Sequence, residues 1–255
     1  MNTTLHDSVL GNGPDVVLLH GLFGQGSNLG GIARGLQGEF KVHSLDLPDH
    51  GHSFWSDPPS IAGYAKAVAD WMEQRELPVA SFVGHSLGGK VAMQLALTQP
   101  VLVDRLVVAD IAPVAYPRGH DGVFAGMAEV ARNPAASRRE AGDLLSKFIS
   151  EDAVVQFLLL HLMRADDGRY VWRLNREGLE AAYDGLREGL DSDLPFDGET
   201  LFLRGGDSDY VLESYAPHMD KLFSHYRVET LEGTGHWLHA EKPAEFNAAV
   251  LDFLL

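Results

Sequence analysis

The chain of 255 residues is long enough for one large domain, or for one domain that carries an insertion. Its formal net charge of −16 disfavours nucleic acids and anionic membrane surfaces as partners, because proteins bind both through basic patches. The absence of cysteine excludes disulfides, thiolate metal sites and a cysteine nucleophile. No apolar run approaches the roughly 20 residues that span a bilayer, and the N-terminus lacks the basic start and apolar core of a signal peptide. We therefore expect a soluble, cytoplasmic protein without membrane insertion.

Short apolar runs alternate with amphipathic stretches in the first part of the chain. Four runs are short, apolar and bounded by turn residues, and strands are expected at 15–21, 40–47, 80–84 and 104–110. Three intervening stretches have helical spacing, and helices are expected at 28–36, 62–75 and 87–99. Strands that alternate with helices predict a mostly parallel sheet that is covered by helices on both faces.

The alternation stops between residues 114 and 195. Apolar residues there recur at helical spacing, as in 153–163, and only 169–174 resembles a short strand. Strands are expected again at 200–205 and 225–231, and helices at 212–221 and 243–254. The sequence thus predicts an α/β core formed by residues 1–113 and 196–255, with residues 114–195 inserted as a helical cap.

Residues Gly84-His85-Ser86-Leu87-Gly88 match the G-x-S-x-G nucleophile elbow. The motif follows an expected strand and opens an expected helix, which is the context that the elbow requires. Its glycines allow a sharp turn that exposes the Ser86 hydroxyl, and the helix N-terminus offers N–H groups to a developing oxyanion. The sequence therefore favours Ser86 as a nucleophile over a chance Gly/Ser turn.

The segment HGLFG, residues 20–24, follows the first strong strand and is placed to complete an oxyanion hole. We expect the backbone N–H groups of Leu22 and Leu87 to be the two donors, with the N–H of Phe23 as the alternative to that of Leu22. Without Ser86, an ordinary strand-to-helix turn would be the better interpretation of this segment.

His236 lies in the glycine-rich loop GTGHW after the last expected strand. A serine hydroxyl needs a base within hydrogen-bond reach, and the order serine, acid, histidine along the chain suits His236. His239 is the alternative base, although its position near the last helix favours a packing or capping role. Among the other histidines, His50 and His52 form an H-x-H pair without a clear third metal ligand nearby, so a structural loop is favoured. His120 with Asp121 is interpreted as part of a solvated loop.

The sequence resembles the α/β-hydrolases, and within them the YbfF-type esterases, over essentially its whole length. The resemblance is carried by LLHGLFGQGSNLG (18–30), DLPDHGHS (46–53), VGHSLGGKVAM (83–93), VVADIAPVAY (107–116), HDGVFAG (120–126), VVQFLLLHL (154–162), LRGGDSDYV (203–211) and GTGHWLHAEKP (233–243). It implies an α/β-hydrolase fold with a helical cap inserted after the sixth strand, and serine esterase or thioesterase activity without a cofactor.

The resemblance also bears on the catalytic acid. The position that usually holds it, in the loop after the seventh strand, is occupied by Ser208, and YbfF-type enzymes are thought to use an aspartate after the sixth strand instead. That residue is Asp110, which ends the strand expected beside the nucleophile strand, at the sheet edge where catalytic groups gather. Asp207, whose position also suits an Asx-turn, is the reserve acid, and Asp209 is the third choice.

These features predict a hydrolase of esters or thioesters of short to medium acyl length, with acyl-coenzyme A as one substrate class and no bound metal. Carbon–carbon bond hydrolysis on the same triad, and slow turnover by a hydrolase-like receptor, remain alternatives. The expected acyl pocket is formed by Phe23, Phe124, Met127, Phe157 and Trp237. The cap arginines that could meet a coenzyme A phosphate are Arg118, Arg132, Arg138 and Arg139, although a mixed solvated surface is favoured for them. A monomer or small homo-oligomer is expected.

Overall fold

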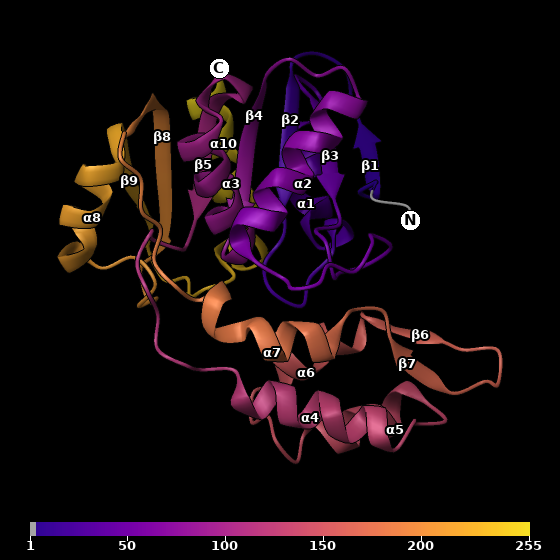
Figure 1. The fold of residues 1–255 in the computed structure, drawn as a ribbon. Coiled ribbons are helices and arrows are strands. Elements are labelled where there is room, and N and C mark those ends of the chain that lie inside the picture. The colour runs from indigo at the N-terminus through magenta and orange to yellow at the C-terminus, as the bar shows by residue number, and fades with distance from the viewer. Residues whose placement is uncertain (1–3) are drawn as a thin grey trace.

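A computed structural model describes residues 4–255, so residues 1–3 of the expected core lie outside the described part of the chain. Its main sheet has the strand order β1–β3–β2–β4–β5–β8–β9 (Figure 1). The strands are β1 (Asp7–Leu10), β2 (Asp15–Leu19), β3 (Lys41–Leu45), β4 (Ala80–His85), β5 (Val103–Ala109), β8 (Phe196–Gly205) and β9 (Phe223–Leu231). All neighbouring strands are parallel except β1, which pairs antiparallel with β3.

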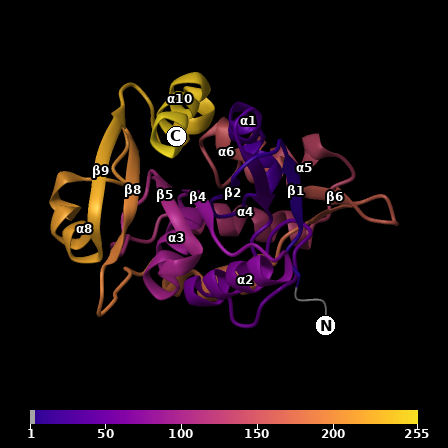
Figure 2. The same cartoon turned by 90° about the horizontal axis from the view of Figure 1, so that it is seen from above.

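Helices cover both faces of this sheet, as expected (Figure 2). One face carries α2 (Ile61–Gln74) and α3 (Leu87–Thr98), and the other carries α1 (Gly30–Leu36) and α10 (Pro243–Leu254). Smaller helical elements are η1 (Gly26–Leu29), η2 (Pro100–Leu102), η3 (Glu213–Tyr215), α8 (Ala216–Leu222) and α9 (Leu238–Glu241). Among residues 4–255, no helix has both the length and the apolar character needed to cross a membrane.

The sequence did not predict β1, because its residues carry no pattern of burial. Its four residues are exposed or half-buried at the edge of the sheet, so they lack the apolar run that identified the central strands. By contrast, four of the five residues of β2 and all six residues of β4 are buried. Helices cover these two strands on both sides, so they form short, continuous apolar runs, and those runs predicted them.

Residues between β5 and β8 form a separate layer at one end of the sheet (Figure 1). This cap contains α4 (Asp121–Arg132), α5 (Arg138–Leu145), α6 (Asp152–Leu159) and α7 (Arg176–Leu186), with a hairpin of β6 (Leu162–Arg164) and β7 (Tyr170–Trp172). The expected short strand at 169–174 is therefore confirmed as β7, whereas β6 was hidden in an apolar run with helical spacing. The cap follows the fifth strand of the described chain rather than the sixth that the resemblance implied.

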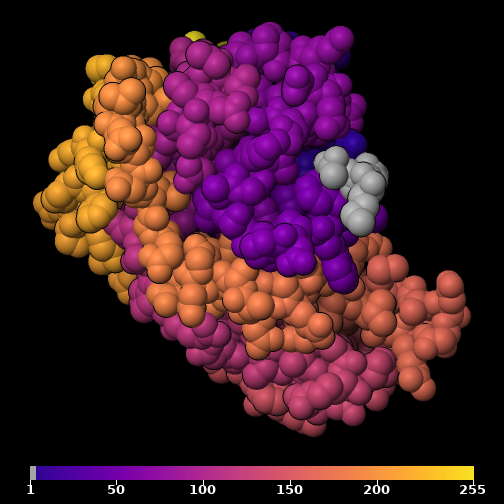
Figure 3. Space-filling model, viewed as in Figure 1, coloured from indigo at the N-terminus to yellow at the C-terminus, as the bar shows by residue number. Residues whose placement is uncertain are grey.

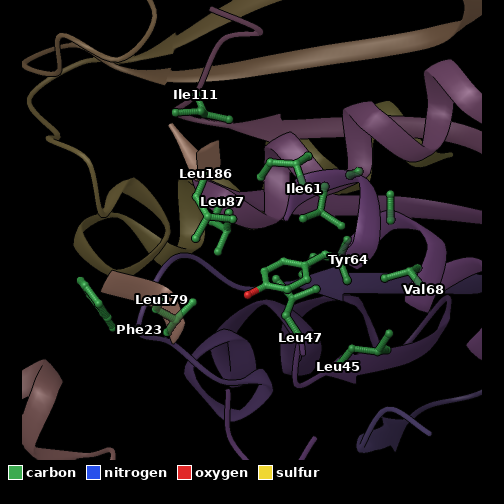
Figure 4. Close-up of a cluster of buried hydrophobic side chains, with 14 of the residues drawn as sticks. Phe23, Leu45, Leu47, Ile61, Tyr64, Val68, Leu87, Ile111, Leu179 and Leu186 are labelled. Carbon is green, nitrogen blue, oxygen red and sulfur yellow. The ribbon is translucent and has the colours of Figure 1, made fainter. Parts of the chain in front are cut away.

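The cap packs directly onto the core (Figure 3). Leu179 and Leu186 of α7 belong to the same buried cluster as Ile61, Tyr64 and Leu87 of the core (Figure 4). Apolar burial of this kind contributes roughly 25 cal/mol for each Å² removed from water, so it holds the cap firmly over the sheet edge.

Lys90 of α3 ties both ends of the cap to the core. Its buried ammonium group donates hydrogen bonds to the carbonyl of Val114 at 3.1 Å, to that of Arg187 at 2.9 Å and to that of Glu188. The first carbonyl lies where the chain enters the cap and the other two where it leaves. Burial lowers the pKa of Lys90 from 10.5 to about 8, and the nearby Glu188 carboxylate partly opposes that effect.

Candidate active site

Ser86 occupies a strained turn between β4 and α3. Its φ of 51° and ψ of −116° lie outside the regions that a serine normally adopts, and its N–H donates a 3.0 Å hydrogen bond to the carbonyl of Ala109. A Cβ at Gly84 would lie 2.4 Å from the Gly88 oxygen, and one at Gly88 would lie 2.2 Å from the Leu19 oxygen. The two glycines of the motif are thus required by close backbone approach, and the turn has the form of a nucleophile elbow.

Asp110 and His236 meet beside this turn. The register pairs His85 with Ala109 and Ala109 with Leu203, which places Asp110 between the ends of β4 and β8. His236 Nδ1 donates a 2.7 Å hydrogen bond to Oδ2 of Asp110. The carboxylate is fully buried, whereas the histidine side chain is 27% exposed. The carboxylate is therefore shielded from solvent and the imidazole is accessible, an arrangement that would suit a general base.

Three further donors hold the loop around Asp110. Gly205 N–H donates to Oδ1 at 2.9 Å, and the Ser208 hydroxyl donates to Oδ2 at 2.5 Å. Ser208 Oγ in turn accepts the N–H of Tyr210 at 3.3 Å. Hydrogen bonds from several donors hold a carboxylate in one orientation.

The structure does not bring the reserve acid to the histidine. Asp207 and Asp209 are both exposed, on either side of the buried Ser208. The Asp207 N–H donates to the Thr234 carbonyl at 2.9 Å, which fixes its backbone in the loop. Because successive side chains in this loop point in different directions, only the middle residue faces Asp110, and the interpretation of Asp207 as a turn residue fits the geometry.

Side chains on two sides position the His236 ring. Tyr210 stacks on it, with 4.0 Å between ring centroids and an interplanar angle of 23°. His85 Nε2 donates a 2.8 Å hydrogen bond to the His236 carbonyl. The alternative base, His239, packs against His85 at 4.5 Å between centroids and has no contact with Asp110 among the hydrogen bonds of residues 4–255. Burial, with the nearby His236, lowers the pKa of His239 to about 4, so it suits a packing role.

The loop 20–24 lies against Ser86. A Cβ at Gly21 would lie 3.4 Å from Ser86 Cβ, so the two backbones approach closely. The Phe23 N–H donates to His50 Nε2 at 3.2 Å and is therefore occupied. In the described part of the chain, no hydrogen bond engages the N–H groups of Leu22 and Leu87, and both residues line the pocket. The Leu22 N–H is therefore free to bind an oxyanion, whereas the N–H of its alternative, Phe23, already has a partner.

Buried histidines fix the shape of that loop, and the sequence pattern did not reveal their role. His50 donates through Nδ1 to the Pro48 carbonyl at 2.8 Å, which leaves Nε2 to accept the Phe23 N–H. His20 donates through Nδ1 to the Gly21 carbonyl at 2.8 Å and accepts the Leu47 N–H at 3.0 Å. Burial lowers the pKa of His50 to about 3 and that of His20 to about 4, so both rings stay neutral at neutral pH.

A pocket of 820 Å³ lies between the sheet edge and the cap. Ser86 and His236 face it together, although no hydrogen bond joins Ser86 Oγ to His236 Nε2 among the described residues. Apolar residues dominate much of its wall, among them Leu22, Leu87, Val123, Ile149, Val154, Phe157, Leu160, Leu186 and Trp237. Such a space accommodates an apolar group beside Ser86 and His236.

The expected pocket residues divide into two groups. Phe157 and Trp237 line the pocket and contact each other, with 5.5 Å between ring centroids. Phe23, Phe124 and Met127 do not line it, and that prediction is wrong. These three side chains are at most 3% exposed and lie in the packed interior, where Phe23 and Phe124 make an edge contact at 5.1 Å. Helical spacing identified them as inward-facing but could not distinguish core from cavity wall.

His120 corrects another expectation. It is half-buried rather than solvated, lines the pocket, and lies with Nδ1 2.5 Å from the Tyr183 hydroxyl. By contrast, the cap arginines behave as a mixed surface. Arg118 pairs with Asp121 and Asp184, and Arg132 pairs with Glu129. Arg138 donates to the carbonyls of Leu159 and Leu162, so it braces the cap.

Both the sequence and the fold of this chain are similar to those of known proteins. Residues 16–249 match the Alpha/beta hydrolase family. The chain is 36% identical to the sn-1-specific diacylglycerol lipase ABHD11 of Mus musculus, over 94% of this chain and 81% of that protein. It is 35% identical to Esterase YbfF of Escherichia coli, over 95% of this chain and 94% of that protein. The solved structure of a marine microorganism esterase superposes with a TM-score of 0.93 at 32% identity, covering 98% of this chain and 99% of the other.

Proposed function

The chain belongs to the α/β-hydrolase family, and from that premise we propose that it is a serine hydrolase of carboxylic esters with Ser86, His236 and Asp110 as its triad. One observation carries the proposal. The Nδ1–H group of His236 donates a 2.7 Å hydrogen bond to the buried Asp110 carboxylate, while the His236 ring and Ser86 line the same apolar pocket. The two relatives and the solved structure are named as esterases or lipases, which supports the same reaction.

The first half of the reaction acylates the serine. His236 Nε2 takes the hydroxyl proton as Ser86 Oγ attacks the ester carbonyl, and Asp110 stabilises the imidazolium that forms. The backbone N–H groups of Leu22 and Leu87 hold the tetrahedral oxyanion. The loss of one such donor typically costs about 10²–10³ in rate. When the intermediate collapses, His236 returns its proton to the leaving alcohol, and the acyl group remains on Ser86.

The second half releases the acid. A water molecule gives a proton to His236 and attacks the acyl carbonyl, and the same two N–H groups hold the second oxyanion. Collapse breaks the bond to Ser86 Oγ, which recovers its proton from His236, and the carboxylic acid leaves. Neither half needs a cofactor, because the charge of each intermediate is met by backbone donors and the imidazolium.

The pocket favours an apolar acyl group of short to medium length. Phe157, Leu160 and Trp237 offer apolar surface near His236, and 820 Å³ exceeds the needs of an acetyl group. Coenzyme A thioesters are the weaker substrate class, because Arg118, Arg132 and Arg138 are already engaged by carboxylates or carbonyls. We therefore rank simple oxygen esters above acyl-coenzyme A.

A comparison of esters with increasing acyl length tests this function. Hydrolysis of p-nitrophenyl acetate, butyrate and octanoate is measured for the wild type and for Ser86→Ala. We expect turnover by the wild type, a higher kcat/KM for butyrate than for acetate, and no turnover by the variant above the uncatalysed rate. If the two proteins show the same rates and no burst of p-nitrophenol, the chain is a hydrolase-like binder instead.

The same protein also discriminates the remaining alternatives. Acetyl- and butyryl-coenzyme A, followed by release of free thiol, test the thioesters, and a set of β-diketones tests carbon–carbon bond hydrolysis. We expect oxygen esters to give the highest kcat/KM. The cytoplasmic location and the oligomeric state stay predictions, which fractionation of cells and light scattering would check.

A further inference from the structure

Three potential metal ligands meet outside the active site, at the end of β3. They are His6, Asp46 and His52, whose ligand atoms all lie within 4.8 Å of one another. Asp46 Oδ2 is 3.0 Å from His6 Nδ1 and 3.4 Å from His52 Nδ1. Ligand atoms bound to one metal ion about 2.0–2.2 Å away lie at similar separations, so the three side chains are already close to a coordinating arrangement.

Both imidazoles are available to a metal. Within residues 4–255, neither Nδ1 atom makes a hydrogen bond, although each is near a carboxylate oxygen. The two side chains are 47% and 52% exposed, so an ion can reach them from solvent. Their rings are tilted against each other, with 4.7 Å between centroids.

The carboxylate is fixed before any ion arrives. Asp46 is 5% exposed, and it accepts the Gly26 N–H on Oδ1 at 2.7 Å and the His52 N–H on Oδ2 at 2.9 Å. These two backbone donors therefore hold the carboxylate in one orientation without help from a metal ion.

The fold brings His6 to this place. The antiparallel pairing of β1 with β3 sets Asp7 opposite Leu45, and the Asp46 N–H donates to the His6 carbonyl at 2.9 Å. The turn that follows brings His52 back over the carboxylate. Gly51 permits that turn, because its φ is 57° and a Cβ there would lie 2.2 Å from Asp46 Oδ2. The sequence showed only the H-x-H pair of His50 and His52. The pairing of β1 with β3 brings His6 and Asp46 close to His52.

We propose that His6, Asp46 and His52 form a site for a divalent transition metal ion of the Zn²⁺ class, with water completing the coordination. Two imidazoles and one carboxylate suit Zn²⁺, Ni²⁺ or Cu²⁺, whereas Mg²⁺ and Ca²⁺ prefer sites made of oxygen ligands. The ion joins the segment before β1 to the loop after β3. That loop also carries His50, which accepts the Phe23 N–H beside the active site. The metal therefore stabilises the framework of the oxyanion loop and takes no part in ester cleavage.

Metal titration of matched variants tests the site. Binding of ZnCl2 to the purified protein is measured by isothermal titration calorimetry, and CoCl2 serves as a spectroscopic probe of coordination. The variants are His6→Ala, His52→Ala and the double variant. His225→Ala is the matched control, because it removes one exposed imidazole from β9, at the opposite edge of the sheet.

We expect one Zn²⁺ site in the wild type and in the control. Each single variant should weaken binding by roughly tenfold or more, because even outer-shell partners of a metal are worth about 10–100-fold in affinity. At Zn²⁺ concentrations about 100 times Kd, the Tm of the wild type and the control should rise by roughly 5 °C, and MgCl2 should have no effect. The double variant should show neither binding nor a Tm shift.

Two results would overturn the proposal. One is Zn²⁺ binding that persists unchanged in the double variant, which would place the ion elsewhere, for example at the pocket histidines. The other is no Zn²⁺ binding by the wild type below millimolar concentrations, in which case the three residues form only an ion-pair cluster. Hydrolysis of p-nitrophenyl butyrate by each variant shows that it has folded, because none of the substituted residues touches the pocket.

Discussion

Ser208 donates a 2.5 Å hydrogen bond to Oδ2 of Asp110, the same carboxylate oxygen that His236 contacts at 2.7 Å. Ser208 stands where the resemblance places the usual acid, and it acts instead as a donor to an acid on the neighbouring strand. The pairing of Ala109 with Leu203 makes this possible, since it sets the ends of β5 and β8 side by side. A carboxylate from either strand can therefore reach one histidine.

The first prediction concerns the acid itself. Asp110→Asn should lower kcat by about 10⁴, because an amide cannot hold the His236 tautomer that leaves Nε2 free to accept a proton. Asp207→Asn is the matched control, as it makes the same change on an exposed neighbour of Ser208 and should keep kcat within about twofold of wild type. Steady-state hydrolysis of p-nitrophenyl butyrate measures both. A large loss in the Asp207 variant together with an active Asp110 variant would reverse the assignment.

The second prediction concerns the Ser208 hydroxyl, which donates a hydrogen bond to Asp110. Ser208→Ala removes one hydrogen bond from a fully buried charge, and such bonds contribute about 1.5–3 kcal/mol. We expect the free energy of unfolding to fall by that amount. The fall in kcat should stay below about tenfold, because Gly205 N–H still orients the carboxylate. Urea denaturation and steady-state kinetics on the same preparation separate the two effects. A loss of activity as large as that of Asp110→Asn would mean that Ser208 has a direct chemical role.

The third prediction concerns the loop beside the nucleophile. A Cβ at Gly21 would lie 3.0 Å from His85 Nδ1, and His85 supports the His236 carbonyl. Gly21→Ala should therefore lower kcat by at least about tenfold through displacement of the loop and of His85. Gly31→Ala places the same methyl group where nothing lies within 4 Å, in α1, and should leave kcat unchanged while raising stability by up to about 1 kcal/mol. Equal activity of the two variants would contradict the close approach.

The sequence predicted those parts of the molecule that local pattern controls. The central strands, the elbow and the cap helices were visible because burial on both faces, glycine spacing and helical periodicity all leave marks within a few residues. The edge strand β1 and the hairpin strand β6 left none, since both lie where one face is exposed or where strand and helix share an apolar run. Their pairing depends on partners distant in the chain.

The site shows the same division. Asp110 was preferred as the acid partly through resemblance, whereas the support from Ser208 and Gly205 depends on strand register and appears only in three dimensions. His50 and His52 show another limit of prediction from sequence. The H-x-H pattern does not indicate that His50 is buried under the oxyanion loop while His52 is exposed. Long-range contacts assign these roles, and a single sequence does not display them.

The fourth prediction concerns the stability of the fold at acidic pH. Burial lowers the pKa of His20 and of His161 from 6.5 to about 4, and that of His50 to about 3. Between pH 6.5 and about 4 the unfolded chain binds protons that the folded protein does not, so the free energy of unfolding falls as pH falls. Each histidine can contribute up to about 3 kcal/mol to this loss. Urea denaturation at pH 7, 6 and 5 should show it. His161→Gln should flatten the dependence and the exposed His225→Gln should not; equal slopes would contradict the assignment.

The fifth prediction concerns alkaline pH and Lys90, whose folded pKa is about 8 against 10.5 for the free side chain. Between these values the unfolded chain holds a proton that the folded protein has lost, so this group adds to the free energy of unfolding as pH rises. The gain is about 3 kcal/mol across the interval. Lys90→Met cannot titrate, so the stability of the wild type relative to this variant should rise by that amount from pH 8 to pH 10.5, as measured by urea denaturation. A constant difference would show that the ammonium group stays charged on its three carbonyls, and that the hydrogen bonds to the cap linkers outweigh the cost of burial.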